Sequence, residues 1–150
     1  MNDCSKPMLS AASPRGNGET ILVIEDESTV REIVRRLLEV RGYRTLAAEN
    51  GSEGLAIYRE HSGKVCLILT DMRMPGVQGT ELIRELRIIN PDARIVAMSG
   101  VLGENDQIAE EPGRLTFLSK PMTLEELMSA VQRVLVGPNP GTTWIAAPSR

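Results

Sequence analysis

Short apolar runs alternate along the chain with longer segments whose apolar residues recur every three or four positions. A short run that is apolar on both faces is typical of a strand buried in a parallel sheet, whereas the longer period is typical of an amphipathic helix. The runs predict strands at residues 21–24, 43–48, 65–70, 94–98 and 115–118.

The periodic segments predict a helix after each strand, and Gly and Pro residues mark where the helices end. One helix follows Ser28 or Thr29 and ends at Gly42, and two more span about 52–61 and 80–90. A short, irregular or mobile helix is expected within 102–113, and a last helix runs from Leu124 to Gly137.

Three of these helices begin with the signature of a capping box, in which a polar residue is followed three positions later by Glu. The side chain of the first residue can accept a hydrogen bond from the backbone of the Glu, whose own side chain can reach back. The pairs are Thr29–Glu32, Asn50–Glu53 and Thr123–Glu126.

The strict alternation of strand and helix favours parallel βαβ units, so the predicted fold class is α/β, a three-layer (βα)5 sandwich. Such sheets bind ligands at the carboxyl ends of the strands, where the strand order reverses. Residues 19–136 form the predicted domain. It lies between a Ser-, Pro-, Gly- and Asn-rich tail at 1–18, expected to be flexible, and a Pro- and Gly-containing tail at 137–150.

The composition is that of an ordinary globular domain, with 41% apolar and 25% charged residues in a chain of 150. A net charge of −3 and an aromatic content of 3% give no reason to expect nucleic acid or an anionic membrane as a direct partner. No apolar run approaches the ~20 residues that span a bilayer, and residues 1–18 lack the apolar segment of a signal peptide, so we expect a cytoplasmic protein. Two cysteines are too few for a disulfide framework, and Cys66 is expected to be a small core residue.

Chemistry-bearing side chains follow four of the predicted strands. Glu25 and Asp26 follow the first strand, Asp71 the third, Ser99 the fourth and Lys120 the fifth. If these strands are neighbours, their carboxylates crowd together, and two carboxylates ~4 Å apart repel by about 4 kcal/mol at an effective dielectric near 20. One lysine does not balance three acids, so the cluster calls for a divalent cation such as Mg²⁺. A cation, a carboxylate nucleophile and a lysine form a clamp for a transferring phosphoryl group.

Four short motifs end these strands, each weak by itself. They are Ile21-Leu22-Val23-Ile24-Glu25-Asp26-Glu27, Asp71-Met72-Arg73-Met74-Pro75-Gly76 followed by Gly79, Ser99-Gly100, and Lys120-Pro121. In this order and at these spacings they are specific, and the chain resembles the receiver domains of bacterial two-component response regulators over about residues 20–136. The resemblance implies a flavodoxin-like receiver fold with a parallel sheet in the order 2-1-3-4-5.

The resemblance implies a role for each matched position. Asp71 would accept a phosphoryl group from a phosphohistidine of a sensor histidine kinase or a histidine phosphotransfer protein. Asp26 would bind Mg²⁺, or Mn²⁺ in its place, directly, and Glu25 mainly through water. Asp71 and the backbone carbonyl of Arg73 would complete the protein ligands.

The remaining matched positions would read the phosphorylated state. Ser99 and Lys120 would bind phosphoryl oxygens, and the Lys120–Pro121 peptide bond is expected to be cis. Phe117 stands at the aromatic switch position of the family. Phosphorylation would reshape the face made by the segment 102–113, the strand 115–118 and the last helix, which a downstream protein partner would bind.

The chain departs from the commonest family pattern at several positions. Glu25 replaces an Asp, Ser99 replaces a Thr and Phe117 replaces a Tyr, so an output that needs the tyrosine hydroxyl is in doubt. Arg73 places a bulky cation at the mouth of the site, and we expect it to alter the lifetime of the aspartyl phosphate.

Other interpretations remain open at this point. The chain resembles the receiver portion of a hybrid sensor histidine kinase, and a receiver that only binds partners is a further alternative. An Asp-nucleophile phosphatase of similar topology would carry a second Asp where Arg73 stands. His61, at the end of a helix, is not expected to be a phosphorelay histidine. Arg31, Arg35 and Arg36 are expected on a solvated helix face, where partner docking is an alternative.

Overall fold

The computed structural model describes residues 16, 18–73, 79–99, 111, 113–120 and 122–136. Both predicted tails, apart from residues 16 and 18, lie outside these ranges. So do the helix expected within 102–113, apart from residues 111 and 113, and the proline of the expected cis bond, Pro121. These expectations therefore stay predictions.

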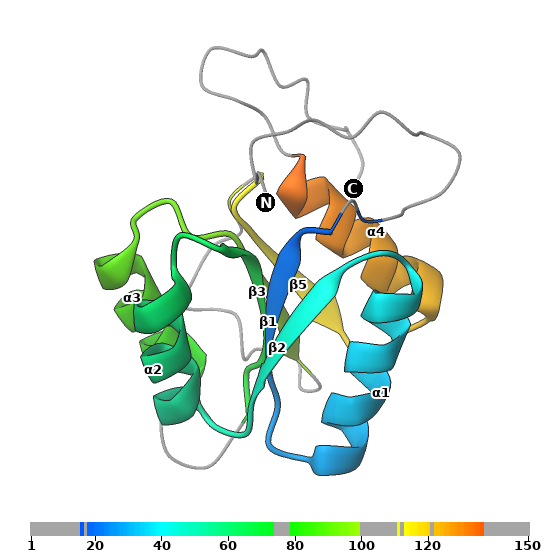
Figure 1. Cartoon of the computed structure of the whole chain (residues 1–150), viewed down its shortest axis with the longest axis horizontal. Coiled ribbons are helices and arrows are strands. Elements are labelled where there is room, and N and C mark those ends of the chain that lie inside the picture. The colour runs from blue at the N-terminus through cyan, green and yellow to red at the C-terminus, as the bar shows by residue number, and fades with distance from the viewer. Residues whose placement is uncertain are drawn as a thin grey trace.

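In the described part of the chain, five parallel strands form one sheet in the order β2-β1-β3-β4-β5, as expected for a receiver (Figure 1). The strands are β1 (Thr20–Ile24), β2 (Arg44–Ala48), β3 (Val65–Asp71), β4 (Ile95–Ser99) and β5 (Leu115–Ser119). β3 occupies the centre, and all seven of its residues are buried because helices cover both faces of the sheet.

Helices pack on both faces of the sheet and complete three layers (Figure 1). α1 (Ser28–Val40) and α4 (Leu124–Leu135) cover one face, and α2 (Gly51–His61) and α3 (Gly79–Ile89) cover the other. Successive side chains of a strand point to opposite faces. Ile21 and Val23 of β1 therefore join the α1/α4 cluster, while Leu22 and Ile24 join the α2/α3 cluster.

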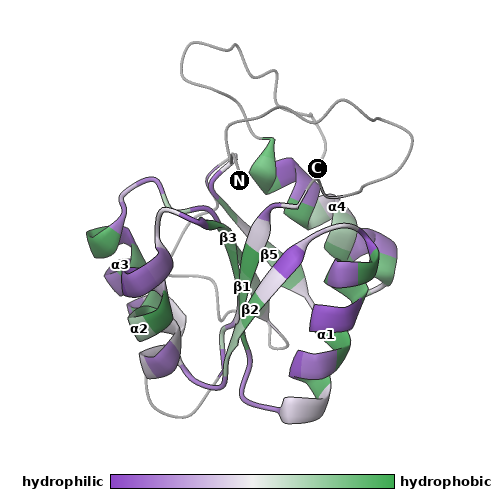
Figure 2. Ribbon diagram, viewed as in Figure 1, coloured by the Kyte–Doolittle hydropathy of each residue, from purple (hydrophilic) through white to green (hydrophobic). Residues whose placement is uncertain are grey.

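The hydropathy of the helices follows this layering. In Figure 2, β1 and β3 are largely hydrophobic, whereas the helices combine a hydrophobic side with a hydrophilic one. Burying apolar side chains from both sheet faces supplies the main driving force for folding, at roughly 25 cal/mol for each Å² removed from water. No helix in the described part of the chain is long and apolar enough to cross a membrane.

Two of the three expected helix caps are present. Thr123 and Glu126 form a reciprocal capping box at the start of α4, with bonds of 2.9 and 3.0 Å. The side chain of Asn50 accepts a 2.8 Å hydrogen bond from the backbone of Glu53 and caps α2.

The expected cap of α1 is wrong. α1 begins at Ser28, its N-cap residue is Glu27, and no side-chain hydrogen bond caps it. The backbone N–H of Glu27 instead donates to the carboxylate of Glu25 at 3.2 Å, so the turn that leaves β1 is organised around an acid from the strand end. Thr29 consequently lies inside the first turn of the helix.

Cys66 lies in β3 and is 6% exposed, as expected of a core residue. It is disulfide-bonded, however, which differs from the sequence-based expectation of a simple core thiol.

Candidate functional site

Three carboxylates meet where β1 and β3 end. The two strands are neighbours, and Ile24 pairs with Thr70, so the residues that follow leave the sheet side by side. Glu25, Asp26 and Asp71 each present an oxygen atom, and these atoms all lie within 4.8 Å of one another. The parallel register therefore brings together acids that are more than forty positions apart in the chain.

Two of these acids are removed from solvent. Glu25 is 1% exposed and Asp71 is 5% exposed, whereas Asp26 is exposed. One oxygen of Glu25, Oε2, accepts from the backbone of Glu27, but the other, Oε1, is buried without a hydrogen-bond partner in the described structure. A buried oxygen without a partner is costly, and this one faces a cluster of like charge.

Burial and charge perturb the titration of Glu25. Its pKa is raised from 4.5 to about 7, chiefly because burial disfavours the charged carboxylate. The N–H of Glu27 acts to lower the pKa, and the negative charge of Asp71 acts to raise it. Near neutral pH it is therefore energetically unfavourable for Glu25 to be ionised together with the other carboxylates of the site.

Lys120 supplies the positive charge that the sequence predicted. Its Nζ lies 2.8 Å from Oδ2 of Asp71, although the two residues are 49 positions apart. Burial acts to lower the pKa of Lys120, but the hydrogen bond to Asp71 and the surrounding negative charges raise it overall. The backbone N–H of Lys120 donates to the carbonyl oxygen of Ser99 at 2.9 Å and holds the end of β5 beside that of β4.

The other oxygen of Asp71 is also oriented. Oδ1 accepts a 3.0 Å hydrogen bond from the backbone N–H of Arg73, whose side chain is exposed. Asp71 is thus held by an ammonium on one oxygen and a backbone amide on the other. The role of the Arg73 carbonyl as a metal ligand stays a prediction.

The donor set fits a hard divalent cation. Three carboxylates and one ammonium leave a charge of −2 when all are ionised, and one buried oxygen has no donor among the described residues. Oxygen ligands of this kind suit Mg²⁺, which binds through one or two carboxylates and keeps several waters. Glu25, Asp26 and Asp71 are the residues that would hold it.

Ser99 and Phe117 lie on the strands next to this cluster. Ser99 is the last residue of β4 and is 8% exposed, one strand away from Asp71. Phe117 is half-buried on β5 and packs against the α2/α3 cluster. The structure gives each residue one position, so their parts in a switch stay predictions.

Arg31 was misjudged from the sequence. It is half-buried, and its Nη1 donates a 2.8 Å hydrogen bond to the backbone carbonyl of Glu25, so it belongs to the site and not to a solvated helix face. Its helical position gives no sign of this, because the target is a backbone oxygen six residues earlier. Arg36, in contrast, is exposed as expected.

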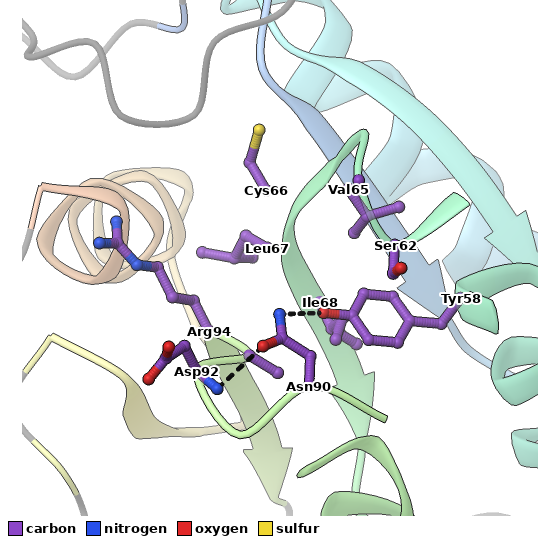
Figure 3. Close-up of a pocket in the computed structure, with 11 residues that line it drawn as sticks. Tyr58, Ser62, Val65, Cys66, Leu67, Ile68, Asn90, Asp92 and Arg94 are labelled. Atoms are coloured by element: carbon purple, nitrogen blue, oxygen red, sulfur yellow. Dashed lines mark hydrogen bonds between the residues drawn. The ribbon is translucent and has the colours of Figure 1, made fainter. Parts of the chain in front are cut away.

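A separate hollow of about 280 Å³ lies at the opposite ends of the strands from the acidic cluster, where β3 and β4 begin (Figure 3). Two hydrogen bonds of 3.0 Å link polar groups of this hollow: the side chain of Asn90 donates to the hydroxyl of Tyr58, and the backbone N–H of Asp92 donates to the side chain of Asn90. Arg94 reaches away to the carbonyl of Leu135 at the end of α4. None of the predicted site residues that the structure describes lines this hollow.

Comparison with known proteins agrees with the geometry at the carboxyl edge. Residues 21–132 match the family model described as the response regulator receiver domain. Sporulation initiation phosphotransferase F of Bacillus subtilis is 33% identical over 119 residues, which cover 78% of this chain and 94% of that protein. Sensor kinase CckA of Brucella abortus is 35% identical over 130 residues, which cover 85% of this chain but 14% of the kinase.

Solved structures share the fold. The response regulator protein TrrA from Thermotoga maritima, in complex with Mg(2+)-BeF, superposes with a TM-score of 0.65 at 30% identity. The match covers 77% of this chain and 98% of TrrA. Because the family model covers most of the chain and the strand order and acidic edge agree with it, this chain belongs to the response regulator receiver domain family.

Proposed function

We propose that Asp71 accepts a phosphoryl group from a phosphohistidine donor with Mg²⁺ bound beside it, and that the modification switches partner binding. One observation carries the proposal: Lys120 Nζ lies 2.8 Å from Asp71 Oδ2 in a site shared with Glu25 and Asp26. A nucleophilic carboxylate, a counter-charge and a cation site are the parts that phosphoryl transfer requires. TrrA, crystallised with Mg(2+)-BeF, supports the choice of metal.

The chain's own residues would hold the reacting atoms in line. A carboxylate oxygen of Asp71 attacks phosphorus, the P–N bond to the donor imidazole breaks, and the imidazole leaves with its electron pair and takes up a proton. The product is an acyl phosphate. Lys120 balances charge on the phosphoryl oxygens, and the hydroxyl of Ser99 donates to one of them. A divalent cation held by Glu25, Asp26 and Asp71 would supply positive charge opposite the transferring phosphoryl oxygens.

The partner-binding face would lie around β5 and α4. Phe117 sits on β5 and packs toward α2 and α3. On the opposite face of β5, toward α4, a hollow of about 460 Å³ is lined by Leu118, Ser119, Glu125, Glu126, Ser129 and Arg133. Movement of Ser99 toward the phosphoryl group would let Phe117 turn inward, which shifts the population between two packings of this face. A downstream protein would read that change.

The donor is a sensor histidine kinase or a histidine phosphotransfer protein. The similarity to sensor kinase CckA, of which the match covers 14%, keeps the receiver portion of a hybrid kinase as an alternative setting for this domain. The chemistry proposed for Asp71 is the same in both settings.

Small phosphodonors test the proposal directly. The chain is incubated with Mg²⁺ and either acetyl phosphate or phosphoramidate, whose P–N bond matches that of the proposed donor, and its intact mass is measured. We expect one added phosphoryl group, which is absent in Asp71→Asn and when EDTA removes the metal. Asp92→Asn is the matched control, because Asp92 is an exposed aspartate outside the cluster. Equal labelling of Asp71→Asn, or no labelling of the parent, would refute the proposal.

A further inference from the structure

The turn between β1 and α1 carries two of the three clustered carboxylates. On its β1 side, the backbone N–H of Glu25 donates to the carbonyl of Ala48 in β2 at 3.0 Å. On its α1 side, Glu27 is the N-cap residue without a side-chain cap. Asp26, between them, is exposed, so its carboxylate is placed mainly by the backbone of the turn.

Arg31 holds this turn from both sides of Asp26. Its backbone N–H donates to the carbonyl oxygen of Glu27 at 2.8 Å, as the first turn of α1 requires. Its side-chain Nη1 donates to the carbonyl oxygen of Glu25, also at 2.8 Å. One residue therefore fixes the carbonyls that flank Asp26, and only the second of these bonds depends on the side chain.

The acceptor that the Arg31 guanidinium uses affects how well the neighbouring carboxylates can bind a cation. Lys120 pairs with a carboxylate of the cluster, whereas the guanidinium of Arg31 donates to a backbone carbonyl. A guanidinium bonded to a carboxylate would compete with a metal for the same oxygens. Bonded to the carbonyl, it orients the turn and leaves the oxygens of Glu25 and Asp26 to the cation.

We propose that Arg31 is a positioning residue for the metal site, and that it sets Mg²⁺ affinity by fixing the Glu25–Asp26 turn. The inference rests on the Mg²⁺ site of the proposed function. Mg²⁺ demands near-ideal octahedral geometry at about 2.0–2.1 Å, so a ligand whose backbone is loosened loses affinity. Partners that orient metal ligands through hydrogen bonds contribute to affinity in this way.

The test is a Mg²⁺ titration followed by thermal unfolding. Arg31→Met keeps the apolar stem and removes the donor, and Arg31→Lys keeps one charged donor. Arg36→Met is the matched control, because Arg36 lies on the same helix, is 78% exposed and, in the described structure, forms an ion pair with Glu32 alone. The measured quantity is the binding midpoint, which is the Mg²⁺ concentration equal to the dissociation constant, obtained by fitting the rise in stability against Mg²⁺ concentration.

We expect Arg31→Met to raise this midpoint about fivefold, which corresponds to about 1 kcal/mol, the typical net contribution of one hydrogen bond. Arg31→Lys should fall between the parent and Arg31→Met, and Arg36→Met should match the parent. A purely structural role would lower the unfolding temperature without Mg²⁺ and leave the midpoint unchanged. If Arg31→Met does not fold, a shifted midpoint in Arg31→Lys supports the inference and an unshifted one overturns it.

The readout separates this inference from the proposed function. A parent that binds Mg²⁺ but is never phosphorylated refutes the proposed function and leaves the titration valid. A parent that is phosphorylated, with an unchanged midpoint in Arg31→Met, overturns the role of Arg31 alone. A parent whose unfolding temperature ignores Mg²⁺ overturns it as well.

Discussion

Glu25→Gln should stabilise the metal-free protein at neutral and alkaline pH, although it removes a proposed metal ligand. Gln keeps an acceptor for the N–H of Glu27, fills nearly the same volume and cannot ionise. In the parent, Glu25 is 1% exposed beside Asp71, and its Oε1 has no hydrogen-bond partner in the described structure. The substitution therefore removes a buried charge without removing packing.

The magnitude follows from the pKa of Glu25, which rises from 4.5 to about 7 on folding. Between these values the folded state binds more protons than the unfolded state, so the free energy of unfolding falls as pH rises through this window. The full loss, at about pH 8, is about 3 kcal/mol, since each pKa unit corresponds to 1.36 kcal/mol. At about pH 4.5 only a small part of this loss is present.

Urea denaturation in EDTA, near each of these pH values, measures the difference between Glu25→Gln and the parent. We expect the variant to gain up to about 3 kcal/mol more at the alkaline pH than at the acidic one. Glu27→Gln is the control, because its side chain is exposed on the same turn, and it should show no comparable pH dependence. A stability difference that is equal at both pH values would refute the burial argument. Saturating Mg²⁺ should reduce or reverse the advantage, because it stabilises the parent by binding.

Three further substitutions test local features. Gly79→Ala should lower the free energy of unfolding by about 1–3 kcal/mol, because an added Cβ would lie 2.8 Å from the backbone at the end of β3. Gly63→Ala should not, because its Cβ would meet nothing within 4 Å, and urea denaturation compares the two variants. Thr123→Ala should lower the free energy of unfolding by about 1 kcal/mol, because it removes the cap of α4. Thr29→Ala should lower it little, because Thr29 does not cap α1, and equal losses in the two variants would contradict the assigned caps. Arg73→Ala should change the rate at which the aspartyl phosphate is lost, because this exposed cation stands two residues after Asp71, where it would crowd or orient the attacking water. The loss is followed by intact mass, and an unchanged rate would dismiss that role.

The sequence determined the fold and the members of the acidic cluster because both depend on simple local patterns. The alternation of apolar runs with amphipathic segments requires a parallel sheet covered by helices, as the structure has. Once the strands are parallel, residues that follow them share one edge. Asp71 and Lys120 could therefore be placed together from sequence, although nothing local joins them. The motifs that end the strands supplied the strand order through their family resemblance.

Only the tertiary structure decided how deeply the site residues are buried and which hydrogen bonds they form. The burial of Glu25, which raises its pKa, depends on neighbouring strands and helices that no local pattern encodes. The cap at Thr29 failed because the acid from β1 already organises the turn, and a spacing rule ignores such competition. The sequence placed Arg31 on a solvated helix face because helical periodicity predicts where side chains lie but not which backbone carbonyls they reach. Its acceptor, the carbonyl oxygen of Glu25, is brought within reach only by the folded conformation of the β1–α1 turn.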